Sequence, residues 1–185
     1  MKFKKYKNKG LGNTSTINSK TKFGKNVQLA YGIVIEKNCE IGDNTFIGYY
    51  TILKPETIIG NNCSIGHHTV LEGKTTIGNK VSIHTLCHIT SKMIIEDDVF
   101  IGPCTLLTNT NRIKHGRNFP LIEEGSMIKR AVRIGGNCVI LPGIVIGENA
   151  LIGAGSVVTR FIPPRERWFG NPATYHGDVQ DNEVL

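Results

Sequence analysis

Large apolar residues recur along this chain at every sixth position, and most positions between them are polar or small. The series runs without a gap from Ile17 to Leu107, then resumes at Ile128 and continues to Val158. An amphipathic helix would need a period near 3.6 residues, and a hairpin sheet has no reason to keep a six-residue unit. A strict period of six is typical of a parallel β-helix, so the pattern predicts an all-β chain of short strands and corners.

A second position in each hexad is also expected to lie inside. The fourth residue after each large apolar one is small or β-branched, as at Thr45, Thr69 and Val81. The residue directly after the large apolar one is often glycine, as at Gly42 and Gly48. Two buried positions separated by a turn describe a short strand followed by a tight corner.

The cysteines fit the same pattern. Cys39, Cys63, Cys87 and Cys138 occupy the small inward position, and Cys104 stands one residue out of it, nearer the surface. We expect the first four to be buried free thiols that pack as small apolar side chains. Their spacing has neither a metal-binding nor a disulfide pattern, which favours a reducing compartment.

The rhythm is interrupted once, at Thr108–Met127, with the sequence TNTNRIKHGRNFPLIEEGSM. A loop longer than about 12–15 residues in a compact domain is usually functional or disordered. A coil of strands and corners has no cleft of its own, so we expect function in this loop or in a groove between neighbouring copies. The predicted organisation is a basic segment 1–16, a β-helix 17–163 with a loop at about 108–127, and a C-terminal segment 164–185.

Composition and charge narrow the class of protein. The 185 residues carry a net charge of +7, which favours anionic partners such as phosphate-bearing cofactors. Apolar runs fall well short of the ~18 residues that span a bilayer, and the Lys-rich start lacks the apolar core of a signal peptide. We therefore expect a cytoplasmic protein without stable membrane insertion. Recognition-helix and aromatic-basic patterns are missing, so nucleic acid is not an expected partner.

Two C-terminal motifs join the hexads to a known family. GAGSVVTR at 153–160 and GNPA at 170–173 follow the loop. From about residue 17 to 173 the chain resembles the bacterial hexapeptide-repeat acyltransferases. The resemblance implies a left-handed β-helix of about seven triangular coils, each made of three hexads. It also implies a homotrimer that binds acetyl-CoA between adjacent subunits, with the loop of one subunit closing the groove.

The resemblance places the cofactor along the last coils. Backbone groups near Gly136 and Ala154, one 18-residue coil apart, are expected to meet the pantetheine amides, with Thr159 and Arg160 nearer the nucleotide. The cofactor-binding residues implied in this way are Gly136, Ala154, Thr159, Arg160, Asn171 and Pro172. Further positive charge nearby comes from Lys129, Arg130, Arg133, Arg165 and Arg167.

The acceptor depends on whether a base is present. A hydroxyl acceptor needs a positioned base, most often His. Related sugar O-acetyltransferases carry that His in the loop, where this chain has Arg112, with His115 three residues later. Thr108–Asn109 and the segment 128–135 are closer to nucleotide-sugar N-acetyltransferases, whose amine acceptor has less need of a strong base. Asn109 would then hold the amine through its side-chain oxygen. His84, at a corner position where glycine is common, is a further candidate.

The predicted function is acetyl transfer from acetyl-CoA to an amino group of a nucleotide-linked sugar, in the synthesis of cell-surface polysaccharide or glycan precursors. The catalytic candidates are His84, Asn109 and His115. A sugar O-acetyltransferase and a non-catalytic trimeric scaffold remain as alternatives. A zinc site of the γ-carbonic anhydrase type needs paired His ligands five residues apart, whereas His84 and His88 are four apart, so no metal is expected.

Overall fold

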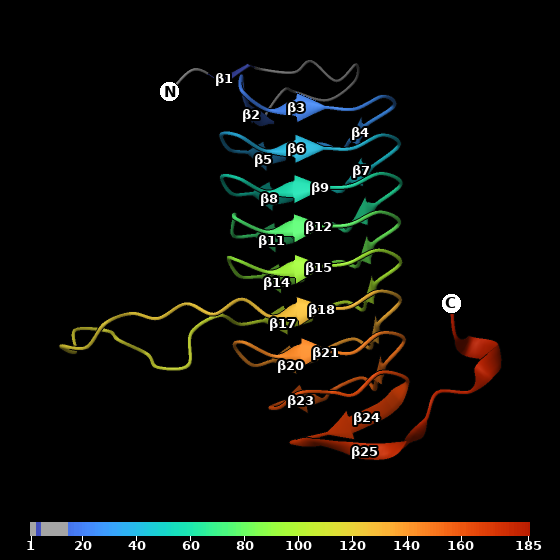
Figure 1. Ribbon diagram of the computed structural model, residues 1–185. Helices are drawn as coiled ribbons and strands as arrows, with labels where there is room; N and C mark the ends of the chain where they lie inside the picture. The colour runs from blue at the N-terminus through green and yellow to red at the C-terminus, as the bar shows by residue number, and fades with distance from the viewer. Residues whose placement is uncertain (1–2, 5–14) are drawn as a thin grey trace.

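The computed structural model describes residues 3–4 and 15–185, and it forms a triangular prism of stacked coils (Figure 1). Three parallel sheets run along the prism, and consecutive strands move from sheet A to sheet B to sheet C. Most strands pair with the strand 18 residues away, as in Ile47 against Ile65, and the pairs that span the long loop are 33 residues apart, as in Leu106 against Val139. The expected left-handed β-helix is confirmed. Apart from Phe3 and Lys4, the predicted basic segment up to residue 14 lies outside the described residues.

The strands of the coils are short, most of them two residues long. Sheet A contains β1 (Phe3–Lys4), β2 (Thr16–Asn18), β5 (Val34–Ile35), β8 (Ile52–Leu53), β11 (Val70–Leu71), β14 (His88–Ile89), β17 (Leu106–Leu107), β20 (Val139–Ile140) and β23 (Val157–Val158). Sheet B contains β3 (Lys22–Phe23), β6 (Glu40–Ile41), β9 (Ile58–Ile59), β12 (Thr76–Ile77), β15 (Ile94–Ile95), β18 (Met127–Ile128) and β21 (Val145–Ile146). Sheet C contains β4 (Gln28–Leu29), β7 (Phe46–Ile47), β10 (Ser64–Ile65), β13 (Ser82–Ile83), β16 (Phe100–Ile101), β19 (Arg133–Ile134), β22 (Leu151–Ile152), β24 (Glu166–Gly170) and β25 (Ala173–Asp178).

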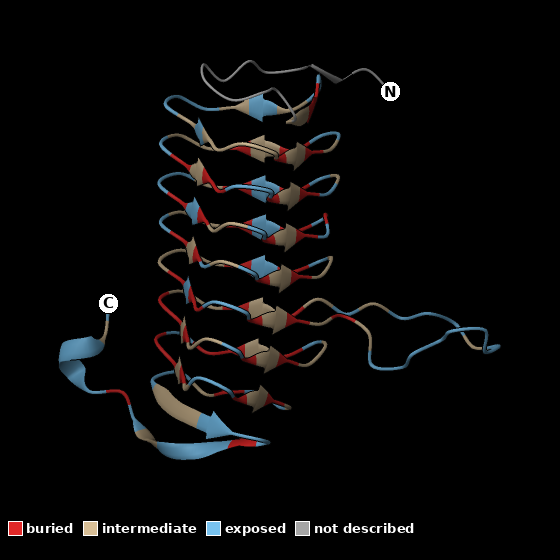
Figure 2. Ribbon diagram, turned by 180° about the vertical axis from the view of Figure 1, so that it is seen from behind, coloured by how far each residue is buried: buried red, intermediate tan, exposed pale blue. Residues whose placement is uncertain are grey.

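The second residue of almost every coil strand fills the core. Ile47, Ile65 and Leu107 are fully buried, and Figure 2 shows the buried positions repeating at each level of the prism. Sheet B supplies seven complete coils, and β23 with β24 adds most of an eighth. The predicted number of about seven coils agrees with this.

The small inward position takes residues that can donate a hydrogen bond. Thr45 Oγ1 donates to the Gly60 carbonyl at 2.9 Å, and Cys63 Sγ lies 3.1 Å from the Gly78 carbonyl oxygen. Thr and Cys are therefore interchangeable there, because both are small and both reach a carbonyl of the next coil. The four cysteines predicted to be buried are buried, and Cys104 is exposed.

The three kinds of corner differ. We name them AB, BC and CA after the sheets that they join. At the BC corners an Asn or Asp side chain caps a backbone N–H of the preceding coil, as when Asn61 Oδ1 accepts from the Asp43 N–H at 2.7 Å. The same contact joins Asp97 to Asn79 at 2.6 Å. Several corner residues have positive φ, a conformation that Asn tolerates better than most residues, and Asn26 and Asn62 are examples.

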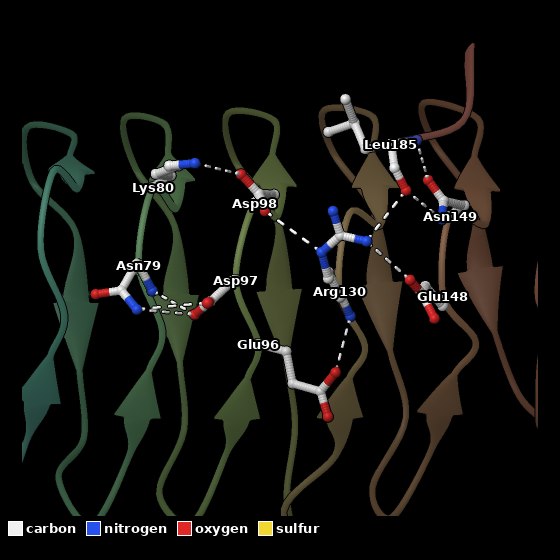
Figure 3. A network of polar contacts seen from close by, with 9 residues as sticks. All are labelled: Asn79, Lys80, Glu96, Asp97, Asp98, Arg130, Glu148, Asn149 and Leu185. Atoms are coloured by element: carbon white, nitrogen blue, oxygen red, sulfur yellow. Dashed lines mark hydrogen bonds and ion pairs between the residues drawn. The ribbon is translucent and has the colours of Figure 1, made fainter. Parts of the chain in front are cut away.

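The C-terminal segment closes the last coil and returns along a BC corner. β24 pairs in parallel with β22, β25 folds back antiparallel on β24, and a short 3₁₀ helix η1 (Asp181–Glu183) follows. At the end of the chain Arg130 donates to the Leu185 carbonyl at 3.1 Å and Asn149 accepts from the Leu185 N–H at 2.8 Å (Figure 3).

Candidate functional site

The long loop leaves the prism at an AB corner. It connects β17 in sheet A with β18 in sheet B and projects far from the coil (Figure 1). The first regular residue after it is Met127, so the loop ends one residue earlier than the sequence predicted. Both strands keep their pairing in the coil: β17 pairs with β20 across the insertion, as in Leu106 against Val139, and β18 pairs with β21, as in Met127 against Val145. The insertion therefore leaves the hexad register intact.

Hydrogen bonds fix the base of the loop. Asn109 is almost fully buried, and its Nδ2 donates to Ser91 Oγ at 2.8 Å. Its Oδ1 accepts from Thr110 Oγ1 at 3.0 Å, and its carbonyl accepts from the Glu124 N–H at 2.7 Å. The prediction that this side-chain oxygen holds the acceptor amine finds no support in these contacts. Asn109 ties the two limbs of the loop to the coil above.

The outer part of the loop is exposed and basic. Arg112 lies over the Phe119 ring, 4.1 Å from its centroid, and the Arg117 guanidinium donates to the His115 carbonyl at 2.8 Å. His115 is exposed, and Ile113 is 84% exposed. Residues 111–118 carry three cationic side chains and no acidic one. Within one chain, this segment presents charge and apolar surface to solvent.

Gly136 and Ala154 lie at successive CA corners, on the other edge of sheet A. The Gly155 N–H donates to the Gly136 carbonyl at 2.9 Å, which joins these two corners. Within the described part of the chain, the N–H groups of Gly136 and Ala154 have no hydrogen-bond partner, in contrast to the capped N–H groups at the BC corners. Two unpaired N–H donors one coil apart suit the amide carbonyls of an extended pantetheine arm.

His84 lies on the same edge, at the CA corner after β13. Its ring meets the edge of Phe100 with centroids 5.0 Å apart, and the side chain is exposed. Gly102 occupies the equivalent position in the next coil. His84 is therefore aligned with Gly136 and Ala154 along one corner of the prism, on the N-terminal side of both.

The remaining predicted cofactor residues lie lower on the prism. Thr159 and Arg160 are at the last AB corner, and Arg160 is exposed without an ion pair to any described residue. Asn171 and Pro172 form the exposed turn between β24 and β25, joined by a cis peptide bond. Beside this turn, the rings of Phe169 and His176 stack with centroids 3.5 Å apart.

Most of the additional cations are already paired. Lys129 contacts Glu96 at 2.8 Å, Arg133 contacts Glu183 at 2.7 Å, and Arg165 pairs with Asp181. Arg130 bridges Asp98 and Glu148 at the BC corner (Figure 3). These groups hold neighbouring coils and the C-terminal tail together, so the expectation that they add free positive charge for a cofactor is not supported.

The outer face of sheet A carries a signal that sequence analysis missed. The outward residues of this sheet follow one another at the coil spacing and are almost all apolar. They are Thr16, Val34, Ile52, Val70, His88, Leu106, Val139 and Val157, and all but Thr16 and His88 are apolar. His88 contacts Glu72 at 3.1 Å. The outward positions of sheets B and C are more mixed, with Lys22, Glu40, Ser64 and Arg133 among them. Each sheet takes one hexad in three, so comparing the outward residues of every third hexad in the sequence would have revealed this apolar face.

A hollow of about 370 Å³ lies on the outer side of sheet B, and Ile94, Glu96 and Arg130 contribute to its lining. It contains none of the predicted site residues. Among the described residues, no group of three His, Cys, Asp or Glu side chains is placed to hold a metal ion. No helix in residues 3–4 and 15–185 has the length and apolar character needed to cross a membrane.

Comparisons with known proteins bear on the repeats first. The family model for the bacterial transferase hexapeptide (six repeats) matches residues 38–73 and 125–160. A dTDP-3-amino-3,6-dideoxy-alpha-D-galactopyranose 3-N-acetyltransferase of Aneurinibacillus thermoaerophilus is 50% identical over 54 residues, 29% of this chain and 28% of that protein. The galactoside O-acetyltransferase of Escherichia coli K12 is 36% identical over 95 residues, 48% of this chain and 45% of that protein. The matches therefore span less than half the length of either relative.

A solved structure extends the likeness over more of the fold. It is a hexapeptide-repeat-containing acetyltransferase of Vibrio cholerae O1 biovar eltor in complex with acetyl coenzyme A. The two chains are 25% identical with a TM-score of 0.52, and the match covers 76% of this chain and 71% of the other. The repeat match and the stacked parallel coils agree: this chain carries sequence repeats like those of the bacterial hexapeptide transferases, and its fold is similar to that of a hexapeptide-repeat acetyltransferase.

Proposed function

We propose that the protein is an acetyltransferase that moves the acetyl group of acetyl-CoA to an amino group on a nucleotide-linked sugar. The observation that carries this proposal is the placement of the site residues on two edges of one apolar sheet. Gly136, Ala154 and His84 line the CA edge of sheet A, and the loop leaves from its AB edge. One chain alone does not bring the two groups together.

A three-fold assembly joins these edges. If three prisms pack with the apolar face of sheet A toward a common axis, the CA edge of each meets the AB edge of the next. The exposed loop of one subunit then covers the open N–H groups at Gly136 and Ala154 of its neighbour. Arg160, at the last AB corner, approaches the same groove, where its guanidinium suits a phosphate of the cofactor. The proposed homotrimer thus explains both the apolar face and the direction of the loop.

The chemistry asks little of the protein beyond positioning. The lone pair of the neutral amine attacks the thioester carbonyl carbon, and the carbon–sulfur bond then breaks. Coenzyme A leaves as the thiolate and ends with the proton that the amine nitrogen gives up. In this proposal the His84 ring, which stands on the N-terminal side of the two N–H donors, carries that proton. Asn109 acts as an anchor of the loop.

A hydroxyl acceptor is the second candidate. It is favoured by the local match to the galactoside O-acetyltransferase, which covers 95 residues. A hydroxyl needs a base in the transition state, and a positioned base contributes roughly 10²–10⁴-fold in rate. His84 and the partner's His115 are the groups that would serve.

The test measures acetyl transfer to matched acceptors that differ only in carrying an amino or a hydroxyl group. The wild-type protein is compared with His84→Gly, which places there the residue found at the equivalent corners Gly66 and Gly102. We expect turnover with the amino sugar nucleotides, falling by less than about a hundredfold in the variant. Turnover only with hydroxyl acceptors, abolished in His84→Gly, would establish the second candidate. If no acceptor is acetylated and coenzyme A does not bind, the proposed function is wrong and the non-catalytic scaffold is the remaining alternative.

A further inference from the structure

Four aromatic side chains form a wall at the CA corners on the N-terminal side of His84. They are Tyr49 and Tyr50 at one corner and His67 and His68 at the next. We call this group the aromatic wall. The rings of Tyr50 and His68 stack with centroids 5.2 Å apart, and those of Tyr49 and His67 are 5.0 Å apart. The Tyr49 N–H donates to His67 Nδ1 at 2.9 Å, so this part of the wall is held in place.

Tyr50 and His68 occupy the left-handed position that recurs at the corners of the coil. Tyr50 has φ of 56° and His68 has φ of 53°. At the BC corners the same left-handed position is filled by Asn26, Asn44 and Asn62, which accept this conformation more easily than a bulky side chain does. Lys80, Leu86 and Lys92 keep a similar φ at other corners, so the coil imposes this conformation and the aromatic rings are not needed for it. Core packing does not require them, because Tyr49 and Tyr50 are 50% and 49% exposed.

The wall lies where an acceptor must approach. Ala154, Gly136 and His84 follow one corner of the prism, and the coils at His67 and Tyr49 continue that line beyond His84. A cofactor arm bound along Ala154 and Gly136 points its thioester toward His84. The acceptor therefore enters from the side of the wall, which is one to two coils away, or about 5–10 Å at ~4.8 Å per coil.

The orientation of the rings favours a flat ligand. The Tyr50 ring lies beside Gly32, stacks on His68 and meets the Tyr31 ring at 89° with centroids 5.8 Å apart, and about half of its surface stays exposed. Ring edges carry partial positive charge and attract the π-face of another aromatic ring. A saturated sugar ring would instead pack on an exposed ring face. The basic loop tip, with Arg112, Lys114 and Arg117, supplies cations suited to a diphosphate.

We infer that the aromatic wall binds the nucleobase of a nucleotide-linked acceptor sugar, while the loop tip of the neighbouring subunit holds its diphosphate. This inference rests on the proposed function and adds the residues that select a nucleotide-linked acceptor. The sugar then extends from the wall toward His84, where the acetyl group is delivered.

The test replaces the wall without disturbing the corner. Tyr50→Asn and His68→Asn, made together, install the residue found at the left-handed positions of the BC corners. Lys80→Asn is the matched control, because Lys80 has φ of 55° at a BC corner away from the wall. Calorimetry with deoxythymidine diphosphate and uridine diphosphate measures binding without any acetyl transfer. We expect the dissociation constant to rise roughly tenfold in the double variant, the order of one lost base contact, and to stay unchanged in the control.

A kinetic cycle uses the same double variant with the nucleotide sugar and with the corresponding sugar 1-phosphate, which lacks the base. We expect the double variant to raise the KM for the nucleotide sugar by about the same factor as loss of the base raises the KM of the wild-type protein. With the sugar 1-phosphate, the double variant and the wild-type protein should have the same KM. If the wild-type protein binds the diphosphates more tightly than the double variant but transfers no acetyl group, the proposed function is wrong. The assignment of the aromatic wall as the nucleobase site is then retained. If the wild-type protein acetylates the nucleotide sugar and the double variant keeps its KM, the wall assignment is overturned. It is equally overturned if the wall matters only for an oligosaccharide acceptor.

Discussion

Replacing Ala154 by proline removes one backbone N–H from the proposed cofactor groove and changes little else. Ala154 holds the second corner position, where proline already occurs at Pro55, Pro103, Pro142 and Pro164. In the preceding coil Gly135 lies next to Ala154, in the same way as Gly147 lies next to Pro164. Because glycine has no Cβ, a proline ring at position 154 has no side chain to clash with there. The N–H that is lost has no hydrogen-bond partner among the described residues, so the folded chain gives up no internal bond.

The expected cost falls on cofactor binding. A neutral hydrogen bond contributes about 0.5–1.5 kcal/mol, and leaving a buried partner unsatisfied costs about 1–3 kcal/mol. The Gly136 and Ala154 corners are partly open to solvent, so we take about 1.4 kcal/mol, which is about tenfold in the dissociation constant for acetyl-CoA. Stability should be unchanged or higher, because a compatible proline restricts the unfolded chain by about 0.4–1 kcal/mol.

Calorimetry with coenzyme A gives the dissociation constant, and loss of thioester absorbance gives the KM for acetyl-CoA. A thiol reagent is avoided in this assay because Cys104 is exposed. Lys37→Pro is the matched control, since Lys37 holds the same corner position at an AB corner near the N-terminal end, with an N–H that has no partner among the described residues. An Ala154→Pro protein that melts normally and binds coenzyme A like the wild type would refute the placement of the pantetheine arm.

Three other changes test the coil, the loop and the thiols. Ile101→Ala removes a fully buried side chain and should lower the free energy of unfolding by about 2–5 kcal/mol in denaturant titration; a loss under about 1 kcal/mol would contradict the packing. A Cβ at Gly125 would overlap the Lys92 carbonyl oxygen, so Gly125→Ala should cost about 1–3 kcal/mol and displace the loop base, with turnover falling more than cofactor binding; unchanged turnover would separate the loop from the site. Burial raises the pKa of the Cys63 thiol above its ordinary 9.0, so its contribution to stability is fully present below pH 9.0 and is lost as the pH rises above it. Cys63→Thr, which copies Thr45 and Thr69, should therefore flatten the fall in unfolding free energy above pH 9.0, and an identical pH profile would argue against the burial.

The loop base shows a role for Asn109 that its sequence motif did not indicate. Asn109 was a reasonable catalytic candidate, because an amide oxygen next to an insertion can hold an amine. Its side chain is instead engaged by Ser91, which precedes it by one coil, and by Thr110. The predicted base His115 lies on the exposed part of the loop, where its carbonyl accepts from Arg117, and among the described residues no hydrogen bond holds its ring. Both outcomes depend on contacts between segments that a local motif does not specify.

The sequence by itself determined the repeating architecture of this protein. A period of six, with a large apolar residue and a small inward residue in each unit, buries both positions when the chain winds into a β-helix. The backbone N–H groups of each coil then donate to the carbonyl groups of the next coil. It therefore also determined the buried thiols, the exposure of Cys104 and the place of the loop. Only the tertiary structure decided which residues share an edge. Three successive hexads face three different directions, so alignment depends on the 18-residue coil and on the corner that each residue occupies. That geometry placed His84 in line with Gly136, Ala154 and the aromatic wall, and it placed the loop on the opposite edge of sheet A.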